Sequence, residues 1–104
     1  MKYTLYHAND ALVMNSFFYG EKSVIYNKRS ALAAFNLGDY EEVRVFELDE
    51  NTSDLAVCNW IYAKSQNIHE PWKLNTRSTS VGDIIRFETG ELYIVAAYGF
   101  DRLQ

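Results

Sequence analysis

Hydrophobic and polar positions alternate along the sequence in short runs that are typical of β-strands. Residues 2–7 alternate loosely and are rich in β-branched and aromatic side chains, so they predict a first strand. Residues 40–49, YEEVRVFELD, predict a second strand with Val43 and Val45 on one face and Phe46 on the other. Because both faces carry apolar side chains, we expect this strand not to form a bare edge of the sheet.

Two other segments have the period of an α-helix. Residues 30–37 begin with Ser30, a good N-cap residue, and are followed by a glycine that can end a helix. Residues 53–65 begin with a cluster of capping residues and predict a second helix. Its apolar stripe consists of Leu55, Cys58 and Tyr62. Cys58 is therefore expected in the core, and so is Trp60, which lies beside the stripe.

The last part of the chain contains two hydrophobic runs, DIIRF and LYIVAAYGF, separated by a turn at Gly90. Two such runs around a glycine predict a C-terminal β-hairpin. Residues 11–27 have no clear period, so they are consistent with either a short helix or a strand. The order of elements predicts a single α+β domain over residues 1–104, with two helices packed on a mostly antiparallel sheet of about four strands.

The composition supports a packed domain that needs neither disulfides nor metal. Of the 104 residues 48% are hydrophobic, and there is only one proline. The single cysteine cannot form an internal disulfide, and the N-terminus has no apolar signal region, so we expect a reducing cytoplasm. The longest apolar run is too short to span a bilayer, so no membrane insertion is expected. The eight tyrosines and six phenylalanines favour some surface contact with a partner.

The net charge of -4 argues against general binding of nucleic acid, which depends on clustered Lys and Arg. The acidity is concentrated in residues 39–54, which hold seven acidic residues and one basic residue. This segment either presents a negative surface to a basic partner or is simply a solvated strand and turn. Its candidate binding residues are Glu41, Glu42, Asp49 and Glu50.

The stretch RSTSVGDIIRF changes abruptly from polar to hydrophobic residues. Gly82 can supply a positive φ and Asp83 can bond to neighbouring backbone amides, so the stretch fits a turn that leads into a strand. It also offers one cation and three hydroxyl groups that could line an anion or a polar peptide: Arg77, Ser78, Thr79 and Ser80. No helix follows, which excludes a phosphate-binding P-loop or Rossmann turn. Both interpretations, ligand loop and structural turn, stay open.

The segments NIHEPW, RSTSVGDII and LYIVAAYGF together resemble a group of small uncharacterised proteins carried by phages, plasmids and actinobacterial genomes. The YodL-like domain of mobile elements is similar in its Arg-Ser-x-Ser-Val-x-Asp part. The resemblance extends from Ala31 onward and supplies no catalytic residues. It implies an accessory protein of a phage or mobile element that acts inside a bacterial cell.

Catalytic and metal-binding patterns are weak in this sequence. The two histidines, His7 and His69, match no ligand spacing with the single cysteine, so neither a metal nor a cofactor is expected. Ser78 or Ser80 with His69 and Asp83 has the residue types of a hydrolase triad, but no glycine-framed elbow surrounds either serine. An uncharacterised hydrolase is therefore only the third hypothesis.

The leading hypothesis is a non-enzymatic module that binds a protein encoded by the host or by the mobile element. Its central loop offers Trp72, which either fills a gap at the core or marks an exposed contact. Beside Trp72 the predicted binding residues are Arg77, Ser78, Ser80 and Asp83. The alternative is a small β-rich module that binds nucleic acid, with a platform made of Tyr19, Lys22, Tyr26, Lys28 and Arg29.

Overall fold

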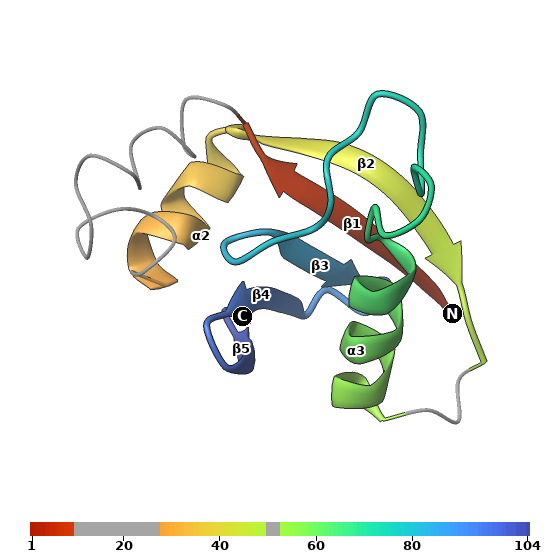
Figure 1. Cartoon of the computed structure of the whole chain (residues 1–104). Coiled ribbons are helices and arrows are strands. Elements are labelled where there is room, and N and C mark those ends of the chain that lie inside the picture. The colour runs from red at the N-terminus through yellow and green to blue at the C-terminus, as the bar shows by residue number, and fades with distance from the viewer. Residues whose placement is uncertain (10–27, 50–52) are drawn as a thin grey trace.

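The computed structural model describes residues 1–9, 28–49 and 53–104 (Figure 1). In chain order the elements are β1 (Lys2–Ala8), α2 (Lys28–Asn36), β2 (Tyr40–Glu47), α3 (Asp54–Lys64), β3 (Ile84–Phe87), β4 (Leu92–Ala96) and β5 (Gly99–Arg102). The strands form one antiparallel sheet in the order β2-β1-β3-β4-β5. The predicted α+β class, antiparallel sheet and C-terminal hairpin are confirmed.

The sheet has five strands instead of the expected four because the final hydrophobic run does not form one continuous strand. It turns back at Ala97 and Tyr98, and Gly99, whose φ is 89°, opens β5. A positive φ of this size is costly for residues with a side chain and easy for glycine. β3, β4 and β5 therefore form a meander.

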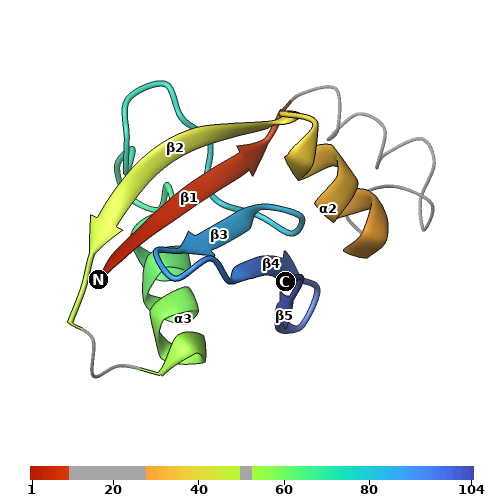
Figure 2. The same cartoon turned by 180° about the vertical axis from the view of Figure 1, so that it is seen from behind.

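The two helices cover opposite faces of the sheet, as the front and back views show (Figures 1 and 2). Successive side chains of a strand point to opposite faces, so the strands supply two separate clusters. Ile85 packs in the cluster on the α3 side, and its neighbour Ile84 packs in the cluster on the α2 side. The strands in the middle of the sheet are therefore apolar on both faces.

β2 lies at an edge of the sheet, so the prediction that this strand is not a bare edge is wrong. The register with β1 shifts at Val43, because Leu5 lies opposite Arg44 while Tyr6 lies opposite Glu42. Val43 is the extra residue of a β-bulge, which reverses the phase of the strand beyond it. As a result, Val43 and Phe46, which were predicted on opposite faces, both pack in the cluster on the α3 side, whereas Val45 is 49% exposed.

α3 was predicted with nearly correct bounds but with the wrong buried face. Ser53 is its N-cap, and the Ser53 hydroxyl accepts a hydrogen bond from the Ala56 amide at 3.3 Å. The buried residues are Val57, Cys58 and Ile61, whereas Leu55, Tyr62 and Trp60 are exposed. Of the predicted stripe only Cys58 is in the core, together with Ile61, which was expected beside the stripe.

α2 also differs from its predicted start. It includes Ser30, which is therefore not its N-cap, and it ends before Gly38, whose φ of 85° fits the expected helix stop. The helix packs on the sheet through Ala31 and Ala34. Neither α2 nor α3 is long and apolar enough to cross a membrane, and no other described segment forms such a helix.

Candidate functional site

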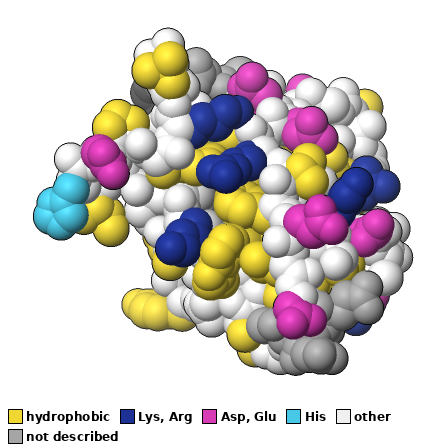
Figure 3. All heavy atoms as spheres, turned by 90° about the vertical axis from the view of Figure 1, so that its right-hand side faces the viewer, with side chains coloured by type: hydrophobic (Ala, Val, Ile, Leu, Met, Phe, Trp, Pro, Cys, Tyr) yellow, Lys and Arg dark blue, Asp and Glu magenta, His cyan; other side chains and the backbone are white. Residues whose placement is uncertain are grey.

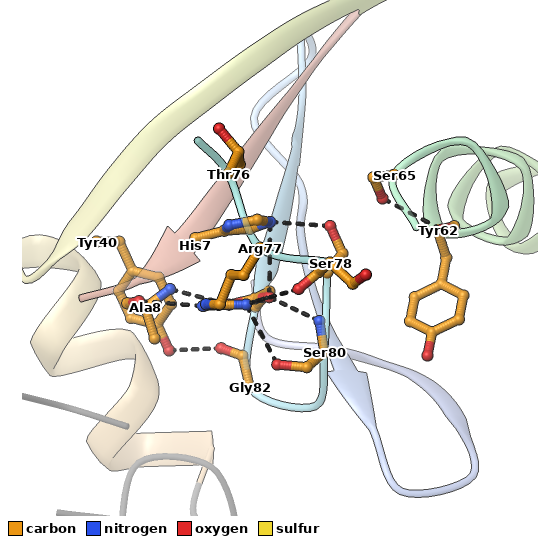
Figure 4. Close-up of polar contacts among 12 residues, drawn as sticks. His7, Ala8, Tyr40, Tyr62, Ser65, Thr76, Arg77, Ser78, Ser80 and Gly82 are labelled. Carbon is orange, nitrogen blue, oxygen red and sulfur yellow. Dashed lines mark hydrogen bonds and ion pairs between the residues drawn. The ribbon is translucent and has the colours of Figure 1, made fainter. Parts of the chain in front are cut away.

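The Arg-Ser-Thr-Ser-Val-Gly-Asp stretch folds around the carboxylate of Asp83, whose hydrogen-bond donors Arg77, Ala8 and Ser80 are labelled in Figure 4. The side chain of Asp83 is fully buried, and its two oxygens accept hydrogen bonds from the Arg77 guanidinium at 2.7 and 2.8 Å. The backbone amides of Ala8 and Ser80 donate to the same carboxylate at 2.9 and 2.8 Å. Each carboxylate oxygen therefore has a charged and a backbone donor, which is the arrangement that a buried charge requires.

Further contacts of this turn join three strands of the sheet. The Arg77 guanidinium also donates to the carbonyl oxygen of Ala8 at the end of β1, at 3.1 Å. The Tyr40 hydroxyl, at the start of β2, donates to the carbonyl oxygen of Gly82 at 2.7 Å, and burial raises the pKa of Tyr40. Gly82 has a φ of 96°, and Asp83 accepts from nearby amides, as predicted. These contacts hold the turn against the sheet and fix the start of β3.

His7, not His69, is the histidine beside this cluster. His7 is buried, its Nε2 shares a hydrogen bond of 2.9 Å with the Thr79 hydroxyl, and the same atom lies 3.8 Å from the Asp83 carboxylate. Burial lowers the pKa of His7 below its ordinary value of 6.5, and Arg77 lowers it further, although Asp83 and Glu41 oppose the shift. His69 is exposed in the loop after α3.

Sequence reasoning missed His7, although the signal was present. Tyr3 and Leu5, two and four residues earlier, are both buried on the α3 face of β1. A period of two places His7 on the same inward face. The alternation that predicted the strand therefore also predicts a buried histidine at its end.

A cleft of about 440 Å³ lies beside the cluster, between the first part of β2 and the loop that follows α3. Glu41 and Glu42 line it from β2, and Lys73 and Arg77 line it from the loop. The structure thus brings part of the predicted acidic surface next to the predicted loop residues. Because both signs of charge face the cleft, its lining favours neither an anionic nor a cationic ligand.

The other predicted binding residues have varied positions. Trp72 is partly buried against the α3-side cluster, and its indole N–H donates to the Arg77 carbonyl oxygen at 2.9 Å. The Ser78 hydroxyl accepts from the Asn67 amide at 2.7 Å, and Ser80 is exposed. Asp49 does not line the cleft and is exposed beyond the end of β2. Glu50 is outside the described residues.

A row of cations on the β2 and α3 side of the molecule was not anticipated from the sequence (Figure 3). The Arg44 guanidinium lies 5.0 Å from the centre of the Phe46 ring, and the Lys64 amine lies 5.7 Å from the centre of the Trp60 ring. The Lys73 amine donates to the carbonyl oxygen of Val43, at the bulge of β2. This row joins residues from β2, α3 and the loop, which sequence spacing alone does not connect.

The single cysteine is not placed for catalysis. Cys58 is fully buried, and burial raises the pKa of its thiol to about 12, with a further contribution from the charge of Asp54. A buried neutral thiol lacks the electropositive, accessible surroundings of a reactive cysteine. Within the described ranges, no group of three or more His, Cys, Asp or Glu residues could hold a metal ion.

Comparison with known proteins gives no significant match to a family model, a curated protein or a solved structure. The function is therefore inferred from the side chains themselves.

Proposed function

We propose that this protein is a non-enzymatic binding module that docks on another protein through the outer surface of α3. The observation that carries this proposal is the composition of that helix. Its charged residues, Asp54 and Lys64, stand at the two ends, and the residues between them are almost entirely apolar. One side is buried in the core, and the opposite sides leave Leu55 55%, Trp60 42% and Tyr62 36% exposed.

Leaving such a helix uncovered costs free energy, because its apolar side chains stay in contact with water. A helix at the surface of a domain normally has a polar outer face, and a helix that is apolar all round is normally covered on all sides. Ala56 and Ala63 extend the apolar surface between the exposed large side chains. Apolar patches of this kind mark binding surfaces, and Trp and Tyr are the side chains that most often dominate binding energy.

A shallow pocket beside α3 supports the same surface. Its volume is about 230 Å³, and it lies between Tyr62 of α3 and Phe100 of β5, whose rings meet edge to face at 6.2 Å. Val81, Val95 and Ala97 complete much of its lining. Such a pocket can receive an apolar side chain of the partner, which would anchor it against α3.

The resemblance to small proteins of phages and plasmids favours a partner that is encoded by the host or by the mobile element and is met inside the bacterial cell. The burial of Cys58 and Asp83 supports a binding function over a hydrolase, because neither side chain can reach a substrate. The residues predicted as a nucleic-acid platform, Tyr19, Lys22 and Tyr26, lie outside the described part of the chain, as do the side chains of Lys28 and Arg29.

A charge placed in the middle of the proposed surface tests the proposal. Ala63→Asp introduces a carboxylate on the outer side of α3, and Ala33→Asp makes the same change at an exposed position of α2. We expect Ala63→Asp to weaken binding of the co-purified partner at least about tenfold, because the carboxylate must be desolvated. The control Ala33→Asp should bind normally. Equal binding by both variants, as measured by titration calorimetry, would contradict the proposal.

A further inference from the structure

Three cations on the β2 and α3 side have no acidic partner among the residues that the structure describes. Arg44 and Lys64 lie over aromatic rings, and Lys73 bonds to a backbone carbonyl. The only ion pairs found between described side chains involve Asp83. In a chain with a net charge of -4, these three cations form a local positive field, which Glu41 and Glu42 adjoin at its Lys73 end.

The same three cations are held in place before any ligand arrives. The ring of Phe46 meets the ring of Trp60 edge to face at 5.8 Å, so the groups under Arg44 and Lys64 form one continuous apolar floor. The long stems of Arg and Lys cover such a floor while their charged ends stay in water. A ligand that meets this surface therefore finds preoriented positive groups around a partly exposed tryptophan.

The geometry favours carboxylates of a protein over the phosphates of a nucleic acid. Binding of single strands needs aromatic faces that are free to stack on bases, but Phe46 is only 6% exposed and Arg44 lies over its ring. Glu41 and Glu42 line the cleft that adjoins Lys73, where they would repel a continuing phosphate backbone. A short acidic segment of a protein can contact the three cations and end before it reaches Glu41 and Glu42.

We propose that Arg44, Lys64 and Lys73 bind the carboxylates of an acidic segment of the partner protein, with an apolar residue of that segment packed on Trp60. This inference rests on the proposed function and specifies the chemistry of its partner. The acidic segment approaches α3 along its β2 side, so the positive row sets the orientation of the partner on the apolar surface. Such charge complementarity acts mainly on association rate and specificity.

Three labelled probes test the inference by fluorescence anisotropy. The first is a short synthetic peptide in which pairs of Glu alternate with Leu, the second has Gln in place of Glu, and the third is a single-stranded oligouridine. We expect the Glu peptide to bind, with an affinity that falls as salt is added, because screening weakens exposed charge pairs. The Gln peptide should bind at least about tenfold more weakly. In NMR spectra the Trp60 indole signal should shift on binding, more than that of Trp72.

Two arginines in β2 and β3, the two strands that flank β1, provide matched variants. Arg44 lies opposite Leu5 of β1, and Arg86 lies opposite Thr4 of β1 and is also exposed. Arg44→Glu should weaken Glu-peptide binding about tenfold and Arg44→Gln by less, whereas Arg86→Glu, with the same change of charge, should bind normally. Circular dichroism establishes that each variant is folded.

The outcomes separate this inference from the proposed function. Tighter binding of oligouridine than of the Glu peptide, or equal binding of the Glu peptide by the Arg44 and Arg86 variants, would overturn the acidic-segment inference. The proposed function would still stand if Ala63→Asp abolished binding of the natural partner while Arg44→Glu did not. The proposed function, but not the acidic-segment inference, would fail if the Glu peptide bound as expected and Ala63→Asp bound the natural partner normally.

Discussion

At the scale of single residues, the main polar feature is the pair formed by the buried Asp83 carboxylate and the partly exposed Arg77 guanidinium. Burying the Asp83 charge is expensive, and the attraction of Arg77 offsets the cost only when hydrogen bonds satisfy the carboxylate. Here the carboxylate has four donors, and the guanidinium also reaches the Ala8 and Ser78 carbonyl oxygens. The pair therefore fixes the geometry of the turn more than it adds net stability.

Removing one side chain of this pair should destabilise the fold by much more than the net contribution of the pair to stability. We expect Arg77→Met to lower the free energy of unfolding by about 3–5 kcal/mol, because Asp83 is left as a buried charge without its cation. Asp83→Asn should also destabilise, and the double variant should lose clearly less than the two single losses combined. Urea denaturation of the four proteins measures this cycle. Additive losses would show that the two side chains do not interact.

His7 should make the stability of the fold depend on pH. Its pKa in the folded state is below the ordinary value of 6.5 that it regains on unfolding. Above pH 6.5 its contribution to stability is fully present, and as the pH falls below 6.5 the unfolded state takes up a proton that the folded state resists. The free energy of unfolding should therefore decrease as the pH falls through this range.

Thermal or urea unfolding at a series of pH values measures this dependence, and the chain provides its own control. His7→Gln should reduce the slope just below pH 6.5, whereas His69→Gln, a change at an exposed side chain, should leave it as in the native protein. A His7→Gln variant with the full native slope would show that another group causes the pH dependence.

The cluster around Asp83 could be predicted from the sequence only in part. Gly82 and Asp83 were assigned correctly because a positive φ and a carboxylate that bonds to nearby amides are local properties of a turn. The bond from the Ala8 amide to Asp83 joins residues 75 positions apart, and no short-range pattern encodes it. Local turn chemistry was therefore visible in the sequence, and the pairing across strands was not.

At the scale of elements, period and capping residues predicted most strands and α3 within a few positions. They did not predict which strand lies at the edge, because both faces of β2 carry apolar residues. The bulge at Val43 explains this pattern: Tyr40 packs on the α2 side and Phe46 on the α3 side. An even spacing of six would otherwise place both side chains on the same face.

The buried face of α3 was misjudged for a related reason. Because apolar residues surround this helix, several stripes fit its sequence equally well, and period alone cannot select among them. The contacts with the sheet select Val57, Cys58 and Ile61. The apolar residues around α3 thus explain both the ambiguity in its sequence and the apolar surface that it exposes in the fold.

The N-cap of α3 can be tested directly. The Ser53 hydroxyl accepts from the Ala56 amide, so Ser53→Ala leaves that amide without its side-chain acceptor. We expect a loss of about 1 kcal/mol in the free energy of unfolding, and Ser53→Asp should retain most of the stability because aspartate also caps helices. Urea denaturation compares them, and equal stability of Ser53→Ala and the native protein would rule out a contribution from the cap.

At the scale of the whole molecule, polar groups and apolar surface are distributed in an unusual way. The Asp83 carboxylate and the Cys58 thiol are buried, whereas large apolar side chains lie outside together with Arg44 and Lys64, which form no ion pair with a described carboxylate. The sheet and its turn act as a rigid support for α3, whose outer surface has the composition of an interface. This division of roles is the basis for proposing docking on a partner with an acidic segment.

The most direct measurement is site-specific photo-cross-linking in the native host. A photoreactive phenylalanine derivative replaces either Ala63 on the outer side of α3 or Ala33 on the exposed side of α2. We predict one discrete protein adduct at position 63 and none at position 33, with the adduct weakened by Arg44→Glu. A discrete adduct at position 33 with none at position 63 would contradict docking through α3.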